Sequence, residues 1–445
     1  NYNVAVGDEA GTAITTGDTN VAVGYQSLST EDTGRQSVAV GYQALAVQNK
    51  DDTNLNTAVG YQAGLAITTG VSNDIFGGSA GDALTTGSFN VAIGRSSLSA
   101  DTLGSTSVAV GHAALATQNF TTATNVYNVA VGYSAGNDIT TGIQNTLIGG
   151  LAGDALTDAD FNVAIGASAL TADTLGSASV AIGNGALGSQ NFTTATSSYN
   201  VAIGMDAGGG VTTGIKNTLI GGLAGDATTV GSDNVSVGYT SLGTNVGGAA
   251  NVAIGAEALS TMNPGSTSSA TYNTAVGAKA GKGITTGIEN TLIGGLAGDA
   301  LTDADYNVAI GKEALTTDTL GSNSVAIGRR ALFSQNFTTA TDAYNIAVGY
   351  EAGVLLTTGI NNTLIGGLAG DALTDADLNV AVGRNALSAD TLGSKSTAIG
   401  TGALAVQNFT TATDTFNTAV GYDAGVGVTT GVQNTLIGAL AGDAL

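Results

Sequence analysis

The sequence has 445 residues, 68 of them Gly, with one Pro and neither Cys nor Trp. High Gly without Pro excludes collagen, a hydrophobic content of 43% excludes a disordered chain, and the lack of Cys excludes disulfides and thiolate metal sites. The formal net charge is −23 with only 11 Lys and Arg, so we expect no nucleic-acid partner.

Both ends of the sequence lie within a repeat pattern. Asn1 is already in phase with that pattern, and Leu445 interrupts it. We therefore expect residues 1–445 to form one continuous repeat array, without caps, taken from a longer protein. No run approaches 18 consecutive apolar residues, so we also expect no membrane span in this segment.

The predicted elements begin with a short apolar segment at residues 3–7 that recurs along the chain. It reads Asn or Ser, Val or Thr, Ala, Val or Ile, then Gly, and this anchor Gly recurs every 17 residues in most steps (24 − 7 = 17). A longer step recurs periodically (132 − 111 = 21), so a unit of 72 residues and four repeats overlies the short one (204 − 132 = 72). Alternating β-branched residues in so short a period predict one solenoid turn, not a helical hairpin.

The predicted fold class is all-β, a parallel β-solenoid (β-roll) of about 25 coils with 17 residues per coil. Thr-Thr-Gly segments such as residues 68–70 supply corners where the backbone needs positive φ. We number positions from the anchor Gly as 0. Within each strand, positions −1 and −3 then point to one face and −2 and −4 to the other.

The strand is apolar on both faces, although a solenoid wall turns only one face inward. The face formed by −1 and −3 would expose on the order of 1,000 Å² of apolar surface, more than a soluble monomer usually shows. We expect another copy of the chain to cover it, in a homo-oligomer or a filament. The residues predicted at this interface are Val4, Val21, Val38, Ile93, Val108, Ile165, Ile182, Ile203, Ile254, Ile310, Ile327 and Ile399.

Position −4 is Asn or Ser in every repeat. Stacked side-chain amides can hydrogen-bond to the coils above and below, as in cross-β arrays, which is the preferred interpretation. The alternative is a row of amides presented to a ligand. The predicted ladder contains Asn3, Asn20, Asn90, Asn162, Asn251, Asn307 and Asn379.

The longer coils carry an insertion that reads Gln-Asn-Phe-Thr-Thr-Ala-Thr at residues 118–124 and recurs three times. Regularly spaced loops on one face of a solenoid often form its binding face, which here would grip a surface glycan or a matrix receptor. In the preferred interpretation the loop instead folds back and its Phe covers a corner of the core or packs between chains. The Phe residues concerned are Phe120, Phe192, Phe337 and Phe409.

An acidic loop at residues 154–160 places Asp154, Asp158 and Asp160 close together in the sequence. Calcium takes six to eight oxygen ligands, of which such a loop could supply about half. Asx turns along a solvated acidic edge are the preferred interpretation, so we expect no cofactor other than this Ca²⁺ candidate. Because the same carboxylates are copied along the chain, and a catalytic pair should be singular and lie in a cleft, we predict no catalytic residue and no enzyme.

Two segments resemble repeats of known families. Residues 179–187, Ser-Val-Ala-Ile-Gly-Asn-Gly-Ala-Leu, resemble the head repeat of YadA-like trimeric autotransporter adhesins. Residues 56–64, Asn-Thr-Ala-Val-Gly-Tyr-Gln-Ala-Gly, are similar to the Asn-Thr-Ala-Val-Gly repeats of phage tail fibres and bacterial surface fibres. The resemblance extends over nearly the whole chain and implies a left-handed β-roll, three chains around one axis, and a place outside the cell, on its surface or on a virion.

The function predicted from these features is a structural shaft in an extracellular, cell-surface or virion fibre. The main alternative is a binding module, either an adhesin head that recognises glycan or matrix through its surface loops or an ice-binding solenoid with arrays of Thr. Ice binding requires a flat Thr column in every coil, whereas Thr-Thr recurs mainly in one coil of four.

Overall fold

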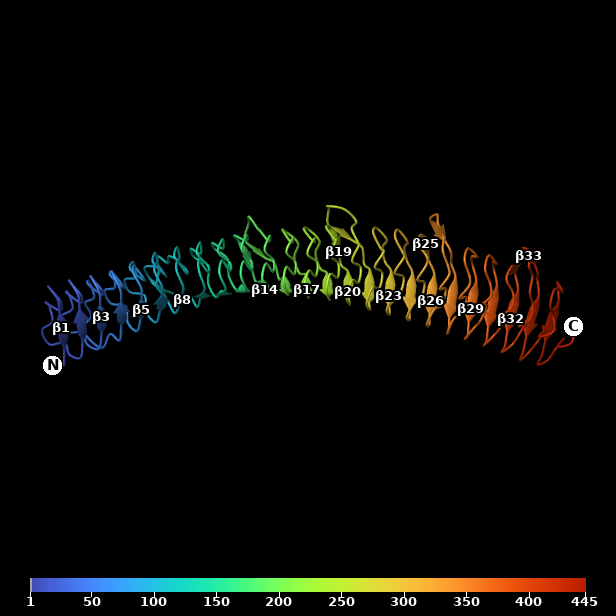
Figure 1. Ribbon diagram of the computed structural model, residues 1–445, viewed down its shortest axis with the longest axis horizontal. Helices are drawn as coiled ribbons and strands as arrows, with labels where there is room; N and C mark the ends of the chain where they lie inside the picture. Colours follow the sequence, from blue (N-terminus) through green and yellow to red (C-terminus); the bar gives the residue numbers. More distant parts are fainter. Residues whose placement is uncertain (1) are drawn as a thin grey trace. The chain divides into compact units, whose positions relative to one another are not determined.

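The computed structural model describes residues 2–445, which fold into strands and turns without any helix. Two compact units, Asn1–Ile220 and Gly221–Leu445, are each a parallel β-solenoid in which one coil follows another (Figure 1). The predicted fold class is therefore confirmed. Anchor glycines continue in 17-residue steps on both sides of the unit boundary, at Gly204, Gly221 and Gly238. One continuous array over residues 1–445 stays a prediction.

Three-residue strands occupy positions −3 to −1 of each coil. In the first unit they are β1 (Val4–Val6), β2 (Val21–Val23), β3 (Val38–Val40), β4 (Thr57–Val59), β5 (Asp74–Phe76), β6 (Val91–Ile93), β8 (Val108–Val110), β10 (Val129–Val131), β11 (Thr146–Ile148), β12 (Val163–Ile165), β14 (Val180–Ile182), β16 (Val201–Ile203) and β17 (Thr218–Ile220). In the second unit they are β18 (Val235–Val237), β20 (Val252–Ile254), β22 (Thr274–Val276), β23 (Thr291–Ile293), β24 (Val308–Ile310), β26 (Val325–Ile327), β28 (Ile346–Val348), β29 (Thr363–Ile365), β30 (Val380–Val382), β32 (Thr397–Ile399), β34 (Thr418–Val420) and β35 (Thr435–Ile437).

Neighbouring strands within a unit pair in parallel and position for position. In the first unit Val4 lies opposite Val21 and Val6 opposite Val23, and in the second unit Val308 lies opposite Val325. A shift of one residue would move every side chain to the other face of the sheet, so the apolar pattern holds this register. Each position therefore forms a column of equivalent residues along its unit.

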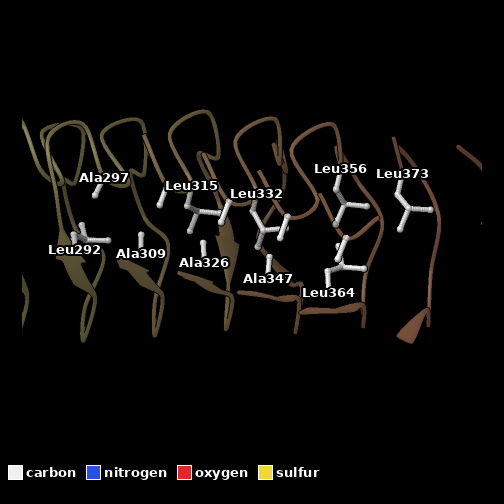
Figure 2. Packing of buried hydrophobic residues seen from close by; sticks show 14 of the residues in the cluster. Leu292, Ala297, Ala309, Leu315, Ala326, Leu332, Ala347, Leu356, Leu364 and Leu373 are labelled. Atoms are coloured by element: carbon white, nitrogen blue, oxygen red, sulfur yellow. The ribbon is translucent and has the colours of Figure 1, made fainter. Parts of the chain in front are cut away.

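The core of each coil lies between two facing rows of side chains, shown for the second unit in Figure 2. The strand row comes from position −2, where Leu292 and Ala309 are fully buried. The opposite row comes from positions +4 and +7, where Leu315 and Leu373 are fully buried. Along the strand row one large residue, Leu or in β5 Ile75, is followed by three small ones, so the opposite row must supply complementary volume to keep the core filled.

The four-coil unit arises from this complementarity. In two consecutive coils position +4 is Gly and position +7 is apolar. In the next two coils position +4 is Leu and position +7 is polar. The exceptions at position +7 are Thr228 in the first kind of coil and Met262 in the second. A Cβ atom on Gly281 would lie 2.7 Å from Cδ1 of Leu292, so the larger strand residue requires the Gly opposite it. The 72-residue period is thus a packing period.

A second, shorter type of strand marks where a long coil pairs with the coil before it. In Figure 1 β19, β25 and β33 lie on the side of the coils away from the three-residue strands β20, β26 and β32. These parallel pairs are β7 (Gly104–Ser105) with β9 (Thr124–Asn125), β13 (Gly176–Ser177) with β15 (Thr196–Ser197), β19 (Gly248–Ala249) with β21 (Ser269–Ala270), β25 (Gly321–Ser322) with β27 (Thr341–Asp342), and β31 (Gly393–Ser394) with β33 (Thr413–Asp414).

Candidate functional site

The outward strand face, which we define as positions −1 and −3 of the three-residue strands, is the principal surface feature of both units. The middle residue of nearly every strand is buried, whereas the residues on both sides of it are half-buried or exposed, as in β16, where Ala202 is buried and Ile203 is exposed. The twelve predicted interface residues all lie on this face. Val4, Ile93, Ile203, Ile254 and Ile399 are exposed, and the other seven are half-buried.

Charge is almost absent from the outward strand face. Position −1 is Val, Ile or Phe in all 25 strands, and position −3 is Val, Ile or Thr in every strand except β5, where it is Asp74. The single chain leaves this face open to solvent, with exposed fractions of 39% for Ile93 and 38% for Ile254. Such a continuous apolar surface is typical of a protein contact site.

Aromatic side chains stack at position +1 along one stretch of the first unit. The ring centroids of Tyr25 and Tyr42 lie 5.3 Å apart, and those of Tyr42 and Tyr61 lie 5.2 Å apart. His112, the single histidine, belongs to the same column and stacks on Tyr133 at 5.5 Å. These distances show directly that equivalent side chains of adjacent coils repeat at about 5 Å, as the spacing of paired strands requires.

A second row, which we call the aromatic column because eight of its ten members are Tyr or Phe and the other two are Leu, lies at position −5 in alternate coils. Its side chains are 48–61% exposed, and each has φ between 50° and 61°. This row was not predicted from the sequence, although its members are two coils apart there (127 − 89 = 38; 161 − 127 = 34). Its members are Leu55, Phe89, Tyr127, Phe161 and Tyr199 in the first unit, and Tyr272, Tyr306, Tyr344, Leu378 and Phe416 in the second.

The asparagines at position −4 form hydrogen-bonded columns inside the coils. The backbone N–H of Asn90 donates to Oδ1 of Asn73 at 3.0 Å, and Nδ2 of Asn90 donates to the carbonyl of Gly104 at 3.0 Å. The fully buried amides therefore do not face a ligand outside the coil. Of the predicted ladder, Asn3 is half-buried, and the fully buried members are Asn20, Asn90, Asn162, Asn251, Asn307 and Asn379.

The insertion loops fold back, so their Phe rings are not presented at the surface of the chain. Phe120, Phe192, Phe337 and Phe409 are only 6–7% exposed. The backbone N–H of Phe120 donates to Oδ1 of Asp101 at 3.2 Å. This bond, with the parallel strand pair beside it, draws the ring onto the preceding coil. The rings cover a corner of the coil, as in the preferred interpretation, whereas the Asn before each Phe and the Thr-Thr-Ala after it are exposed.

A buried polar network accompanies each of these insertions. Nε2 of Gln118 donates to Oδ2 of Asp101 at 2.6 Å and to Oγ of Ser107 at 3.0 Å, while its Oε1 accepts from Asn128 at 2.9 Å. Burial raises the pKa of Asp101, against the opposing effect of its hydrogen bonds from Gln118 and backbone N–H groups. Sequence reasoning missed this network. Equivalent bonds join Asp173 to Gln190, Asp318 to Gln335, and Asp390 to Gln407.

The three aspartates considered for calcium each bond to a different partner. Oδ1 of Asp154 accepts from Thr171 at 2.5 Å, Oδ1 of Asp158 from Thr141 at 2.7 Å, and Oδ1 of Asp160 from the backbone N–H of Ile143 at 2.7 Å. These partners lie in the coils before and after. Within residues 2–445 no group of three or more His, Cys, Asp or Glu side chains is arranged to hold a metal ion.

These features define the chain as a tandem-repeat parallel β-solenoid protein with an outward strand face that carries a single charged residue. Comparison with protein-family models, with curated proteins and with solved structures finds no match. The resemblance to adhesin head repeats and tail-fibre repeats stays a prediction. The part of the chain that the structure describes contains no helix with the length and apolar character needed to cross a membrane.

Proposed function

We propose that this protein is the structural shaft of a fibre in which identical chains pack lengthwise through their outward strand faces. The observation that carries the proposal is the near absence of charge on that face, where Asp74 is the one charged residue at positions −1 and −3. Full burial of each Val or Ile contributes roughly 1.5–3 kcal/mol, so covering many half-exposed side chains favours association strongly.

The chemistry of the face suits an identical partner. The columns of Val, Ile and Thr contain one charge that would have to be desolvated, Asp74, and symmetric homo-oligomers use the same patch on each copy. The resemblance to trimeric adhesins favours three chains and a location outside the cell or on a virion. A net charge of −23 would keep neighbouring fibres apart.

The acidic side chains support a structural role rather than a catalytic one. Asp101 and its equivalents are buried and hydrogen-bonded to Gln side chains, and the loop aspartates bond between coils. Burial of the insertion Phe rings argues against a receptor contact made through those rings. We therefore propose no enzymatic activity and no receptor contact through these loops.

The test places a charge on the outward strand face in each unit, as Ile182→Asp and Ile310→Asp. An uncompensated carboxylate in an apolar interface costs several kcal/mol, so the oligomer should dissociate. Sedimentation equilibrium should show a mass that falls from a multiple of 43.2 kDa to the single-chain value.

A matched control adds the same charge at a corner, as Thr69→Asp and Thr430→Asp. Both residues are exposed at position +9, where the chain itself carries Asp158 and Asp303 in other coils. The control should keep the oligomer mass. A native chain that sediments as a single molecule, or Ile variants with unchanged mass, would disprove the proposed shaft interface.

A further inference from the structure

We propose that the aromatic column binds an extended, neutral β-1,4-linked polysaccharide laid along the stack of coils. The observation behind this proposal is the placement of a large, half-exposed side chain at position −5 in every second coil, in two runs of five. One run extends from Leu55 to Tyr199 in the first unit, and the other from Tyr272 to Phe416 in the second.

The spacing of the column favours this ligand class. Rings of adjacent coils at position +1 are 5.2–5.3 Å apart, so members of the aromatic column should repeat at about 10 Å, or two strand spacings. In an extended β-1,4-linked hexose chain successive sugar rings are turned over, so equivalent faces recur every second sugar. Two sugar lengths in such a chain are close to two coil steps.

The chemistry of the column also fits such a chain. A β-gluco-configured sugar directs its C–H bonds to the two ring faces, and these stack on the electron-rich face of an aromatic ring. Polar side chains occupy position −5 in many intervening coils, among them Gln144, Asn323 and Asn361, and these could hydrogen-bond to the equatorial hydroxyls. A net charge of −23 disfavours an anionic polymer.

The fold itself does not require aromatic residues at this position. Ala178 and Ala250 occupy it in other coils with φ of 59°, so the backbone needs only a residue that accepts the left-handed conformation. Bulky residues with positive φ are uncommon and cost of order 1 kcal/mol or more each. Tyr272 and Tyr199 are about 60% exposed, so core packing accounts for only part of their presence.

The aromatic column is chemically distinct from the interface of the proposed shaft. Position −5 carries the charged residues Lys216, Asp233, Glu289 and Lys395, whereas the outward strand face carries only Asp74. Charges are depleted in the core of protein interfaces and tolerated at their rim. The column therefore lies at the margin of the proposed interface, and polysaccharide binding does not depend on self-association.

The experiment measures depletion of the full chain from solution by microcrystalline cellulose and by chitin, with granular starch as the α-1,4-linked comparison. We expect binding to the two β-1,4-linked polymers and at least about tenfold weaker binding to starch, whose chain coils and does not present alternate rings at this spacing. Equal binding to starch, or no binding to either β-1,4-linked polymer, overturns the proposal.

A first variant pair identifies the binding column. Tyr272→Ala, Tyr306→Ala and Tyr344→Ala together should weaken binding by about tenfold for each ring removed. The control removes three tyrosines of similar exposure from position +1 of the same unit. Its changes are Tyr239→Ala, Tyr350→Ala and Tyr422→Ala, and binding should stay unchanged. Equal losses in both variants contradict the assignment to position −5.

A second variant tests the spacing without changing composition. Exchanging Tyr306→Asn with Asn323→Tyr moves one ring into the next coil, so the three tyrosines of the aromatic column in this unit no longer repeat at two coils. Binding should fall by about tenfold or more, and retained affinity overturns the spacing argument. Oligomer mass should stay unchanged in every variant. If the native chain binds no polysaccharide and the Tyr-to-Ala variant has a lower oligomer mass, the aromatic column is instead a contact with a second copy of the chain.

Discussion

At the scale of single residues, glycine is required where two coils approach most closely. The anchor glycines have φ between 127° and 145°, and a Cβ atom on Gly149 would lie 2.4 Å from the carbonyl oxygen of Gly166. The next residue, Gly150, has no positive φ, and a Cβ atom there would meet nothing within 4 Å. Adjacent glycines in one turn therefore have different physical roles.

This difference predicts opposite effects of the same substitution. Gly149→Ala should lower the free energy of unfolding by about 3 kcal/mol or more, because backbone strain and a clash with the next coil add together. Gly150→Ala should be neutral, or stabilising by about 0.5 kcal/mol, through the lower entropy of the unfolded chain. Urea unfolding followed by circular dichroism measures both, and equal effects would refute this account of the anchor position.

At the scale of the coil, one four-coil block departs from the others and acts as a natural comparison. Asp101 and Gln118 belong to the block whose anchor glycines run from Gly60 to Gly111. They correspond to Asn245 and Met262 in the block whose anchor glycines run from Gly204 to Gly255. Oδ1 of Asp101 accepts from the backbone N–H of Gly104 at 3.0 Å, and Oδ1 of Asn245 accepts the equivalent bond from Gly248 at 2.8 Å. Asn273 lies 4.0 Å from the sulfur of Met262. The acid and the amide are thus replaced together, as expected for partners in one buried network.

We predict that these two substitutions are not additive. Gln118→Met alone removes a donor from the buried carboxylate of Asp101 and should lower the free energy of unfolding by about 2 kcal/mol. Adding Asp101→Asn to the same chain removes the carboxylate and should recover at least half of that loss. A double-mutant cycle by urea unfolding gives the coupling, and a value near zero would show that the two side chains act independently.

The strands and their faces could be predicted from the sequence, because side chains of a strand alternate strictly between two sides. That rule placed Ile203 outward and Ala202 inward, as the structure has them. The alternation rule fails at corners, because residues there such as Tyr127 have positive φ, and this backbone conformation decides where the side chain points. The position of Phe120 depends on a hydrogen bond to Asp101, 19 residues away, which no local pattern reveals.

At the scale of the whole molecule, acidity is the dominant electrostatic property. The formal net charge is −23, and burial raises the pKa of the carboxyls of Asp82, Asp101, Asp299 and Asp371. A raised pKa means that the folded state holds its proton more tightly than the unfolded chain does. The resulting stabilisation is fully present below the ordinary Asp pKa of about 3.9 and is lost as pH rises through the folded-state values.

We therefore predict that mild acid stabilises the fold. The urea midpoint should rise as pH falls from 7 towards about 4, and the lower net charge should act in the same direction. Asp82→Ser should reduce this pH dependence, because Oδ1 of Asp82 is buried and finds no hydrogen-bond partner within residues 2–445. The exposed Asp8→Ser removes the same charge and should leave the slope nearly unchanged. A midpoint that falls on acidification would contradict the sign.

The matching of Leu and Gly across the core has a consequence for how the gene can change. Removing or duplicating 72 residues keeps each large core residue opposite a small one at the junction. Losing a single 17-residue coil would instead place two leucines opposite each other or leave a void. Unequal recombination between copies would therefore be tolerated only in multiples of four turns. The length of such a protein would then evolve in discrete increments.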